Sequence, residues 1–187
     1  MKTSIKTKSA IFPQPVLMIA TYNDDGSVNV MNAAWGMMID SDVLALNLAS
    51  ERKTLANMRK RGGFTVSLAD SAHAAEADYF GVESGNKIAD KLSKAGLTAA
   101  KSELVDAPIV NEFPVCMECE FIEFQSAAYG AGVIGKILNV LAEEAVQTNG
   151  NVDISKLGAI AYDPFTHGYY TFGERVGNAF SDGLKLR

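Results

Sequence analysis

The chain is poor in the residues on which many enzyme and metal sites depend. Its 187 residues include two cysteines, two histidines and one tryptophan. Neither His73 nor His167 lies beside a nucleophile motif such as G-x-S-x-G, which argues against a Ser-His-Asp hydrolase. The G-x-x-x-x-G-K-[ST] sequence of a nucleotide-phosphate loop is absent as well. The chain therefore lacks the defining motifs of two large protein classes, the Ser-His-Asp hydrolases and the proteins with a nucleotide-phosphate loop.

The sequence also lacks a long apolar run and an excess of basic charge. The longest uncharged apolar run, residues 28–39, has about half the residues that a membrane-spanning helix needs. Residues 1–15 contain lysines but no apolar stretch typical of a signal peptide. The net charge is −5, and no basic face dominates. We therefore expect a cytoplasmic protein that binds neither a membrane nor a nucleic acid.

The two cysteines form a C-x-x-C pair, Cys116 and Cys119, within a strand-like run. A zinc site would need two further ligands, and redox C-x-x-C motifs open a helix. In a strand, residues i and i+3 point to opposite faces. We predict that both thiols are buried and unreactive.

Short apolar segments separated by turn residues predict a mainly β protein. Residues 133–146 fit a helix as well as a strand, and we choose a hairpin with the strand before them. Short helices are expected within residues 71–81 and 86–96, and a longer one over 50–63, with Ser50 as its N-cap and glycines at its end. The predicted strands are 15–22, 28–39, 43–49, 64–69, 115–129, 133–146, 157–163 and 168–173. This pattern indicates a single domain over residues 1–187, a β-barrel with helices inserted between strands.

An anion site is predicted where the strand 43–49 runs directly into the helix 50–63. The start of a helix presents free N–H groups and the positive end of its dipole. Two hydroxyls and two cations stand within this first turn, at Ser50, Arg52, Lys53 and Thr54. The alternative is an ordinary surface helix with a solvated basic face.

The strand 28–39 supports the anion site, because its middle is built from small residues. Asn32 and two alanines lead into Trp35, and Gly36 follows. A flat slot of small residues edged by tryptophan, next to a phosphate site, suits a phosphorylated aromatic cofactor.

Several blocks of the sequence, in order, resemble one known family. These blocks are NVMNAAWG (29–36), SERKT (50–54), DYFGVESG (78–85), LVDAPIVNEFPVCMEC (104–119) and AYDPFTHGYYTFGERVGNAFSDG (161–183). From Pro15 to Gly183 the chain is similar to the flavoredoxin and flavin-reductase-like family of FMN-binding split barrels. The resemblance implies a mainly β, Greek-key split barrel with short helical excursions. It also implies a homodimer with FMN near the interface.

The resemblance further implies which residues hold FMN. Those along the flavin ring and its slot are Asn32, Ala33, Ala34, Trp35, Leu48 and Ala49. Those at the phosphate are Ser50, Arg52, Lys53 and Thr54, with Asn57 at the ribityl chain. Residues 78–87 would close over the cofactor, with Phe80, Ser84 and Lys91 as further candidates. Tyr170 would approach from the partner subunit. No catalytic side chain is expected, because electrons enter and leave at the flavin itself.

One departure from the family concerns the electron donor. Many split-barrel flavin reductases carry Gly-Asp-His before the strand equivalent to residues 134–140, where it is associated with the nicotinamide. This chain has Ala128, Tyr129 and Gly130 there. The missing histidine favours an electron carrier that is reduced by a redox partner protein. The alternatives are an NAD(P)H-dependent reductase that releases reduced FMN, and a β-barrel dimer with a non-redox ligand.

Overall fold

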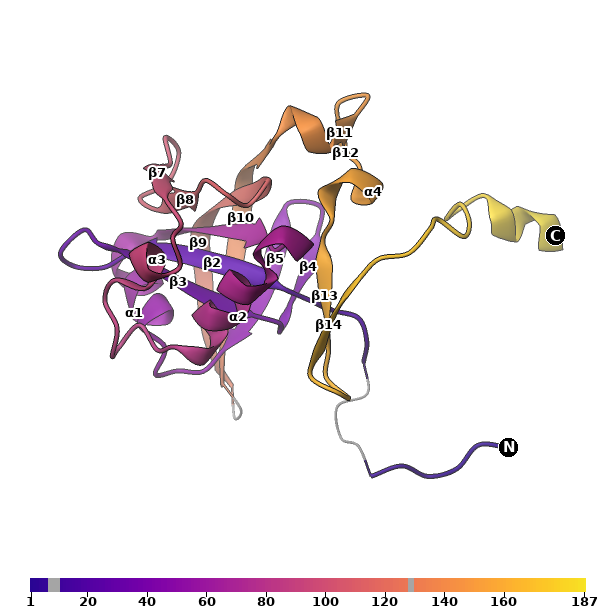
Figure 1. Ribbon diagram of the computed structural model, residues 1–187, viewed down its shortest axis with the longest axis horizontal. Coiled ribbons are helices and arrows are strands. Elements are labelled where there is room, and N and C mark those ends of the chain that lie inside the picture. The colour runs from indigo at the N-terminus through magenta and orange to yellow at the C-terminus, as the bar shows by residue number, and fades with distance from the viewer. Residues whose placement is uncertain (7–10, 128–129) are drawn as a thin grey trace.

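A curled antiparallel sheet of seven strands forms the centre of the molecule (Figure 1). The computed structural model describes residues 1–6, 11–127 and 130–187, with side chains omitted for 123–131. The strand order is β3-β2-β6-β9-β10-β5-β4. The strands are β2 (Leu17–Tyr22), β3 (Val28–Ala33), β4 (Gly36–Asp40), β5 (Val43–Leu48), β6 (Gly63–Leu68), β9 (Val115–Ala127) and β10 (Gly130–Ala142). This arrangement confirms the mainly β fold with short helices.

Smaller sheets and short helices surround this half-barrel. One sheet of three strands has the order β1-β13-β14, and two hairpins pair β7 with β8 and β11 with β12. Their bounds are β1 (Gln14–Pro15), β7 (Ala99–Lys101), β8 (Pro108–Val110), β11 (Gln147–Thr148), β12 (Asn151–Val152), β13 (Ile160–Asp163) and β14 (Gly168–Thr171). The α-helices are α1 (Lys53–Arg61), α2 (Ala74–Val82), α3 (Lys91–Lys94) and α4 (Ile154–Leu157). Single 3-10 turns are η1 (Ser71–His73), η2 (Glu144–Val146) and η3 (Asp182–Leu186). In the described parts of the chain, no helix is long and apolar enough to span a membrane.

The predicted single strand 28–39 is wrong, because the chain divides there into β3 and β4. These two strands pair with β2 and β5 and form opposite edges of the seven-stranded sheet. Only Ala34 and Trp35 join them, so the two edges must lie close together and the sheet must curl. A Cβ at Gly36 would lie 2.5 Å from Leu17 Cδ1 and 2.7 Å from Leu46 Cδ2. Glycine at position 36 therefore lets the chain cross between the edges.

The start of the helix α1 also differs from the prediction. Its N-cap is Arg52, which makes no side-chain capping hydrogen bond, and Ser50 lies exposed before the helix. A turn closed by the Arg52 N–H on the Ala49 carbonyl (3.1 Å) delays the helix beyond Ser50. The predicted glycine stop is confirmed, since Gly62 adopts a left-handed φ of 70° and its N–H donates to the Met58 carbonyl at 2.8 Å.

The hairpin interpretation of residues 133–146 is confirmed as far as Ala142, where β10 ends. β10 pairs along its length with β9, and a helix would have left the edges of β9 and β5 without partners.

Cys119 lies in the core inside the half-barrel, and Cys116 is buried as well. Burial raises the pKa of both thiols, that of Cys119 to about 12. The prediction of buried cysteines is confirmed.

Candidate functional site

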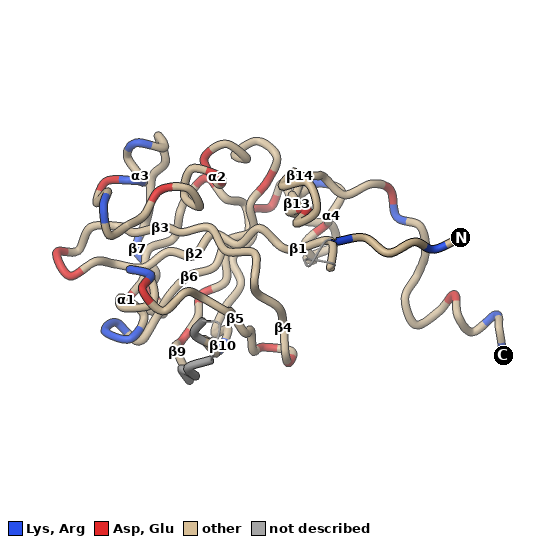
Figure 2. The backbone as a smooth tube through the Cα atoms, turned by 90° about the horizontal axis from the view of Figure 1, so that it is seen from below, with Lys and Arg blue, Asp and Glu red and all other residues tan. Residues whose placement is uncertain are grey.

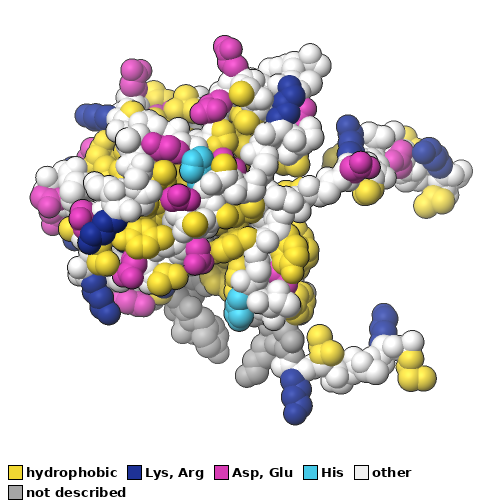
Figure 3. Space-filling view, in the orientation of Figure 1, with side chains coloured by type: hydrophobic (Ala, Val, Ile, Leu, Met, Phe, Trp, Pro, Cys, Tyr) yellow, Lys and Arg dark blue, Asp and Glu magenta, His cyan; other side chains and the backbone are white. Residues whose placement is uncertain are grey.

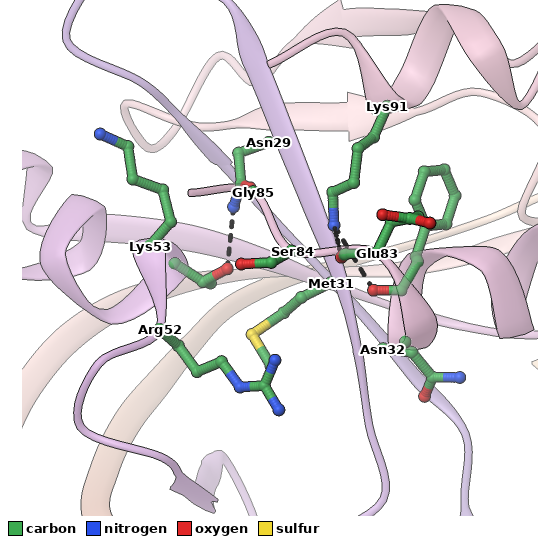
Figure 4. Close-up of a pocket in the computed structure, with 12 residues that line it drawn as sticks. Asn29, Met31, Asn32, Arg52, Lys53, Glu83, Ser84, Gly85 and Lys91 are labelled. Atoms are coloured by element: carbon green, nitrogen blue, oxygen red, sulfur yellow. Dashed lines mark hydrogen bonds between the residues drawn. The ribbon is translucent and has the colours of Figure 1, made fainter. Parts of the chain in front are cut away.

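A polar hollow lies where the first turn of α1 meets β3 and the segment after α2 (Figure 4). We call it the inner pocket. Its free volume is about 10 Å³, roughly room for one water molecule. Its lining residues are Asn29, Met31, Asn32, Arg52, Lys53, Thr54, Phe80, Gly81, Glu83, Ser84, Gly85 and Lys91.

Positive charge dominates this inner pocket. Figure 4 shows the Arg52 guanidinium and the Lys91 ammonium pointing toward its middle, while the Lys53 side chain extends away from them. Among the residues that the structure describes, no Asp or Glu forms an ion pair with these three side chains. Of the three, only Lys91 is buried, and a buried charge in a protein is normally paired, so this ammonium calls for an anion.

Lys91 is the least expected of these cations, because only 2% of it is exposed. Its ammonium donates to the carbonyls of Glu83 (2.9 Å) and Phe80 (3.4 Å) and lies 5.8 Å from the centre of the Phe80 ring. Burial, together with the charge of Arg52, lowers the pKa of Lys91 to about 8, although the Glu83 carboxylate opposes the shift. The two carbonyls accept hydrogen bonds from the ammonium, but neither is an anion that would neutralise its charge.

The polar wall opposite Lys91 is held in place by packing. Thr54 is buried, and its Oγ1 accepts a hydrogen bond from Asn29 Nδ2 at 2.8 Å. A hydroxyl that accepts in this way keeps its own hydrogen for another acceptor. Gly85 covers this pair so closely that a Cβ there would lie 2.1 Å from Asn29 Oδ1. The N–H groups of Lys53 and Thr54, which come before the first hydrogen bond of α1 (Leu55 N–H to the Arg52 carbonyl, 3.1 Å), add donors on the same side.

The inner pocket continues into a second hollow, which we call the slot. The two share Met31, Asn32 and Arg52. The slot has a volume of about 300 Å³ and is also lined by Ala33, Ala34, Trp35, Asn47, Leu48 and Ala49. Ala33 and Leu48 form its buried floor, whereas Trp35 is 53% exposed at its edge. The Asn47 N–H donates to the Trp35 carbonyl at 2.8 Å and so ties the two sides together.

The structure thus brings most of the sequence-predicted site residues together. Asn32, Ala33, Ala34, Trp35, Leu48 and Ala49 meet in the slot, and Arg52, Lys53, Thr54, Phe80, Ser84 and Lys91 meet in the inner pocket. Asn29 belongs to the same site, although no sequence pattern selected it, and Gly85 lies in the segment 78–87 that was expected to close over the cofactor. Asn29 and Met31 are two residues apart on β3, so strand alternation puts their side chains on one side, but only the tertiary structure shows that this side lines the pocket.

Three predicted residues lie outside both hollows. The Asn57 amide is buried against β2 and donates to Thr21 Oγ1 (3.0 Å) and Asn23 Oδ1 (2.9 Å), so it is engaged away from the pocket. Ser50 is exposed before α1. Tyr170 lies on β14, 51% exposed, in a T-shaped contact with the Phe12 ring. The missing Gly-Asp-His motif concerns residues 128–130, of which 128 and 129 lie outside the described residues.

The molecule is a curled antiparallel half-barrel that carries a cationic pocket joined to a flat slot. Comparison with known families assigns this fold to one of them. The family model of the flavin reductase like domain matches residues 9–162, and the chain belongs to this family. Members of the family typically bind FMN.

Two solved structures are similar over essentially the whole chain. Flavoredoxin of Desulfovibrio vulgaris (Miyazaki F) is 34% identical, with a TM-score of 0.92 over 98% of this chain and 100% of that one. Flavoredoxin from Methanosarcina acetivorans is 25% identical, with a TM-score of 0.90 and full coverage of both chains. An uncharacterized protein of Aeropyrum pernix is 30% identical over 116 residues, and this chain spans 44% of its length. The split-barrel fold expected from the resemblance is confirmed.

Proposed function

We propose that this chain binds FMN as a prosthetic group and carries electrons between partner proteins. The phosphate lies in the inner pocket and the isoalloxazine ring lies in the slot. The observation that carries this proposal is the meeting of Arg52 and Lys53, at the start of α1, with Lys91 of α3, next to a small-residue slot. Among the described residues these three cations have no ion-pair partner.

The residues present fit both ends of such a cofactor. Arg52, Lys91 and the Thr54 hydroxyl supply donors and positive charge for a phosphate. Arg52 is exposed and Lys53 is half-buried, so both side chains can rearrange to admit a group larger than a water molecule. The slot volume of about 300 Å³ lies at the lower end of the range for small-ligand sites.

The slot also offers hydrogen bonds to the polar edge of a flat ring. β3 is an edge strand that pairs only with β2, so the backbone groups on its other side remain without ladder partners. Asn32 is fixed in the slot by its amide, which donates to the Ala77 carbonyl at 2.9 Å. When bound, FMN supplies the hydride and single-electron chemistry. The protein holds the ring against Ala33 and Leu48 and leaves the side toward Trp35 open to a donor or acceptor.

An absorption spectrum of the purified protein is the first test of FMN binding. We expect a yellow protein, or a colourless one that takes up added FMN stoichiometrically. A protein that stays colourless with FMN present would refute the assignment and favour a non-redox ligand.

The choice between a carrier and a reductase rests on a different observation. Family reductases associate the histidine of Gly-Asp-His with the nicotinamide, and this chain has Gly130, the first residue of β10, in its place. Several contacts to one phosphate should in addition retain the flavin. We expect FMN to stay bound through gel filtration and to be bleached slowly by NADH or NADPH under anaerobic conditions. Chemical reduction should bleach it fully. Rapid turnover of free FMN with either nicotinamide would instead identify an NAD(P)H-dependent FMN reductase, with FMN binding itself upheld.

A further inference from the structure

Four buried polar side chains connect β2 to the inner pocket. We call them the buried network, and each is between 0% and 3% exposed: Thr21 on β2, Asn29 on β3, and Thr54 and Asn57 on α1. These three elements pack together at the end of the body away from both termini (Figure 2). Charged side chains stand at the surface of this end (Figure 3), whereas the network is buried, where a polar group costs free energy unless it is hydrogen-bonded.

The strand register and the helix period bring the four side chains together. Thr21 and Asn29 are direct partners in the antiparallel pair of β2 and β3. Thr54 and Asn57 are three residues apart on α1, so they lie on one face of the helix. Asn57 Nδ2 donates to Thr21 Oγ1 at 3.0 Å, and Asn29 Nδ2 donates to Thr54 Oγ1 at 2.8 Å and to Thr21 Oγ1 at 3.4 Å. The hydrogen bonds therefore form a path that begins and ends on α1.

The orientation of the Asn29 amide decides what the Thr54 hydroxyl can bind. With the NH₂ group toward Thr54, Asn29 is the donor, and the Thr54 hydrogen is left for an acceptor in the inner pocket. With the amide turned by half a rotation, Asn29 Oδ1 would instead accept that hydrogen. Thr21 Oγ1 favours the first orientation, because it accepts from the amides of both Asn29 and Asn57.

We propose that Thr21 and Asn57 are positioning residues for the phosphate of FMN, and that they act through Asn29 on the Thr54 hydroxyl. Thr21 and Asn57 line neither the inner pocket nor the slot, whereas Asn29 and Thr54 line the inner pocket. A hydrogen bond to a charged phosphate is stronger than one to a neutral amide, so freeing the Thr54 hydrogen favours FMN. Riboflavin, which lacks the phosphate, gains nothing from it. This inference rests on the proposed FMN site.

The Kd for riboflavin divided by the Kd for FMN measures the contribution of the phosphate alone. Thr21→Val keeps the shape of the side chain and removes its hydroxyl. We expect it to lower this ratio roughly two- to tenfold, the range for one neutral hydrogen bond, and Thr21→Ser should restore the ratio. Asn57→Leu breaks the network at its other end and should lower the ratio in the same way, so either variant can test the proposal if the other fails to fold.

Thr65→Val is the matched control for the loss of a buried hydroxyl. Thr65 is 0% exposed on β6, but its Oγ1 donates to the Pro108 carbonyl at 2.6 Å, outside the buried network. We expect Thr65→Val to leave the ratio unchanged. A fall of the same size in Thr65→Val and Thr21→Val would overturn the proposal, because it would show a general effect of buried hydroxyls.

A double-mutant cycle tests whether Thr21 acts through Thr54. Thr54→Val alone should lower the ratio roughly ten- to a hundredfold. Thr21→Val added to Thr54→Val should lower it no further, because the hydroxyl that Thr21 positions is gone. Additive effects, or an unchanged ratio in Thr21→Val alone, would overturn the positioning role and leave the FMN site standing. An unaltered protein that binds riboflavin as tightly as FMN would refute the phosphate site itself, and the positioning role with it.

Discussion

We expect the buried ammonium of Lys91 to make the proposed FMN binding sensitive to pH. Without a ligand, burial and the charge of Arg52 lower the pKa of Lys91 from 10.5 to about 8. A phosphate in the inner pocket would stabilise the charged form and raise this pKa again. Above about pH 8, binding must then take up a proton, so the affinity for FMN falls as the pH rises. Below that pH, Lys91 is charged in both states and contributes no pH dependence.

The size of the effect follows from the two pKa values. If the bound phosphate returns the pKa of Lys91 to its ordinary value, the Kd for FMN rises roughly twentyfold between about pH 7.5 and about pH 9.5. Near pH 9, close to one proton should be taken up for each FMN bound, which calorimetry in buffers of different ionisation enthalpy measures. Quenching of flavin fluorescence gives the Kd at each pH.

Two controls separate this effect from other titrations. Riboflavin lacks the phosphate but shares the ring, so ring titration alone should affect both flavins equally. Lys91→Met should abolish the pH dependence, whereas Lys94→Met on the same helix should keep it, because Lys94 is exposed and paired with Asp90. A flat Kd for the unaltered protein over this range, or an unchanged slope in Lys91→Met, would show that Lys91 does not face the phosphate.

Three further predictions concern binding and stability. Arg52→Ala should weaken FMN binding roughly ten- to a hundredfold and riboflavin binding little, because a charge-assisted hydrogen bond is worth about 1.5–3 kcal/mol. Lys60→Ala, on the exposed side of α1, is its control in the same titration, and equal losses for both flavins would place the phosphate elsewhere. Gly85→Ala should weaken FMN binding more than tenfold, because its Cβ would lie 2.1 Å from a side-chain oxygen of the pocket wall, and unchanged affinity would show that the wall can shift freely. Gly36→Ala should lower the free energy of unfolding in urea by about 1–3 kcal/mol through overpacking. Gly183→Ala, which meets open space, should not, and equal stability of the two variants would contradict the close crossing between β3 and β4.

Local sequence patterns were sufficient for the parts of this protein that depend on near neighbours. The glycine stop of α1 and the gathering of cations at its start follow from residues within a few positions of one another. For residues 133–146 the local pattern fitted a helix as well as a strand, and the hairpin chosen there is the one that forms. The small residues from Asn32 to Trp35 marked one wall of the slot for the same reason. The resemblance to a family supplied the segment around Phe80 and Lys91, which no local pattern connects to α1.

The tertiary structure decided how distant segments share space, and no local pattern carries that information. The strand predicted over 28–39 is divided because the seven-stranded sheet curls until its two edge strands, β3 and β4, lie close together. This curl is a property of the whole sheet, so a single strand's sequence does not reveal it. Asn57 lies one helical turn beyond Lys53, but β2 packs there and takes its amide, which removes it from the pocket. The local pattern around Lys91, a short polar helix, gives no sign of burial. The ammonium is buried because it donates to the carbonyls of Phe80 and Glu83 at the end of α2. Burial, and with it the altered charge equilibrium of Lys91, arises only when these elements pack against one another.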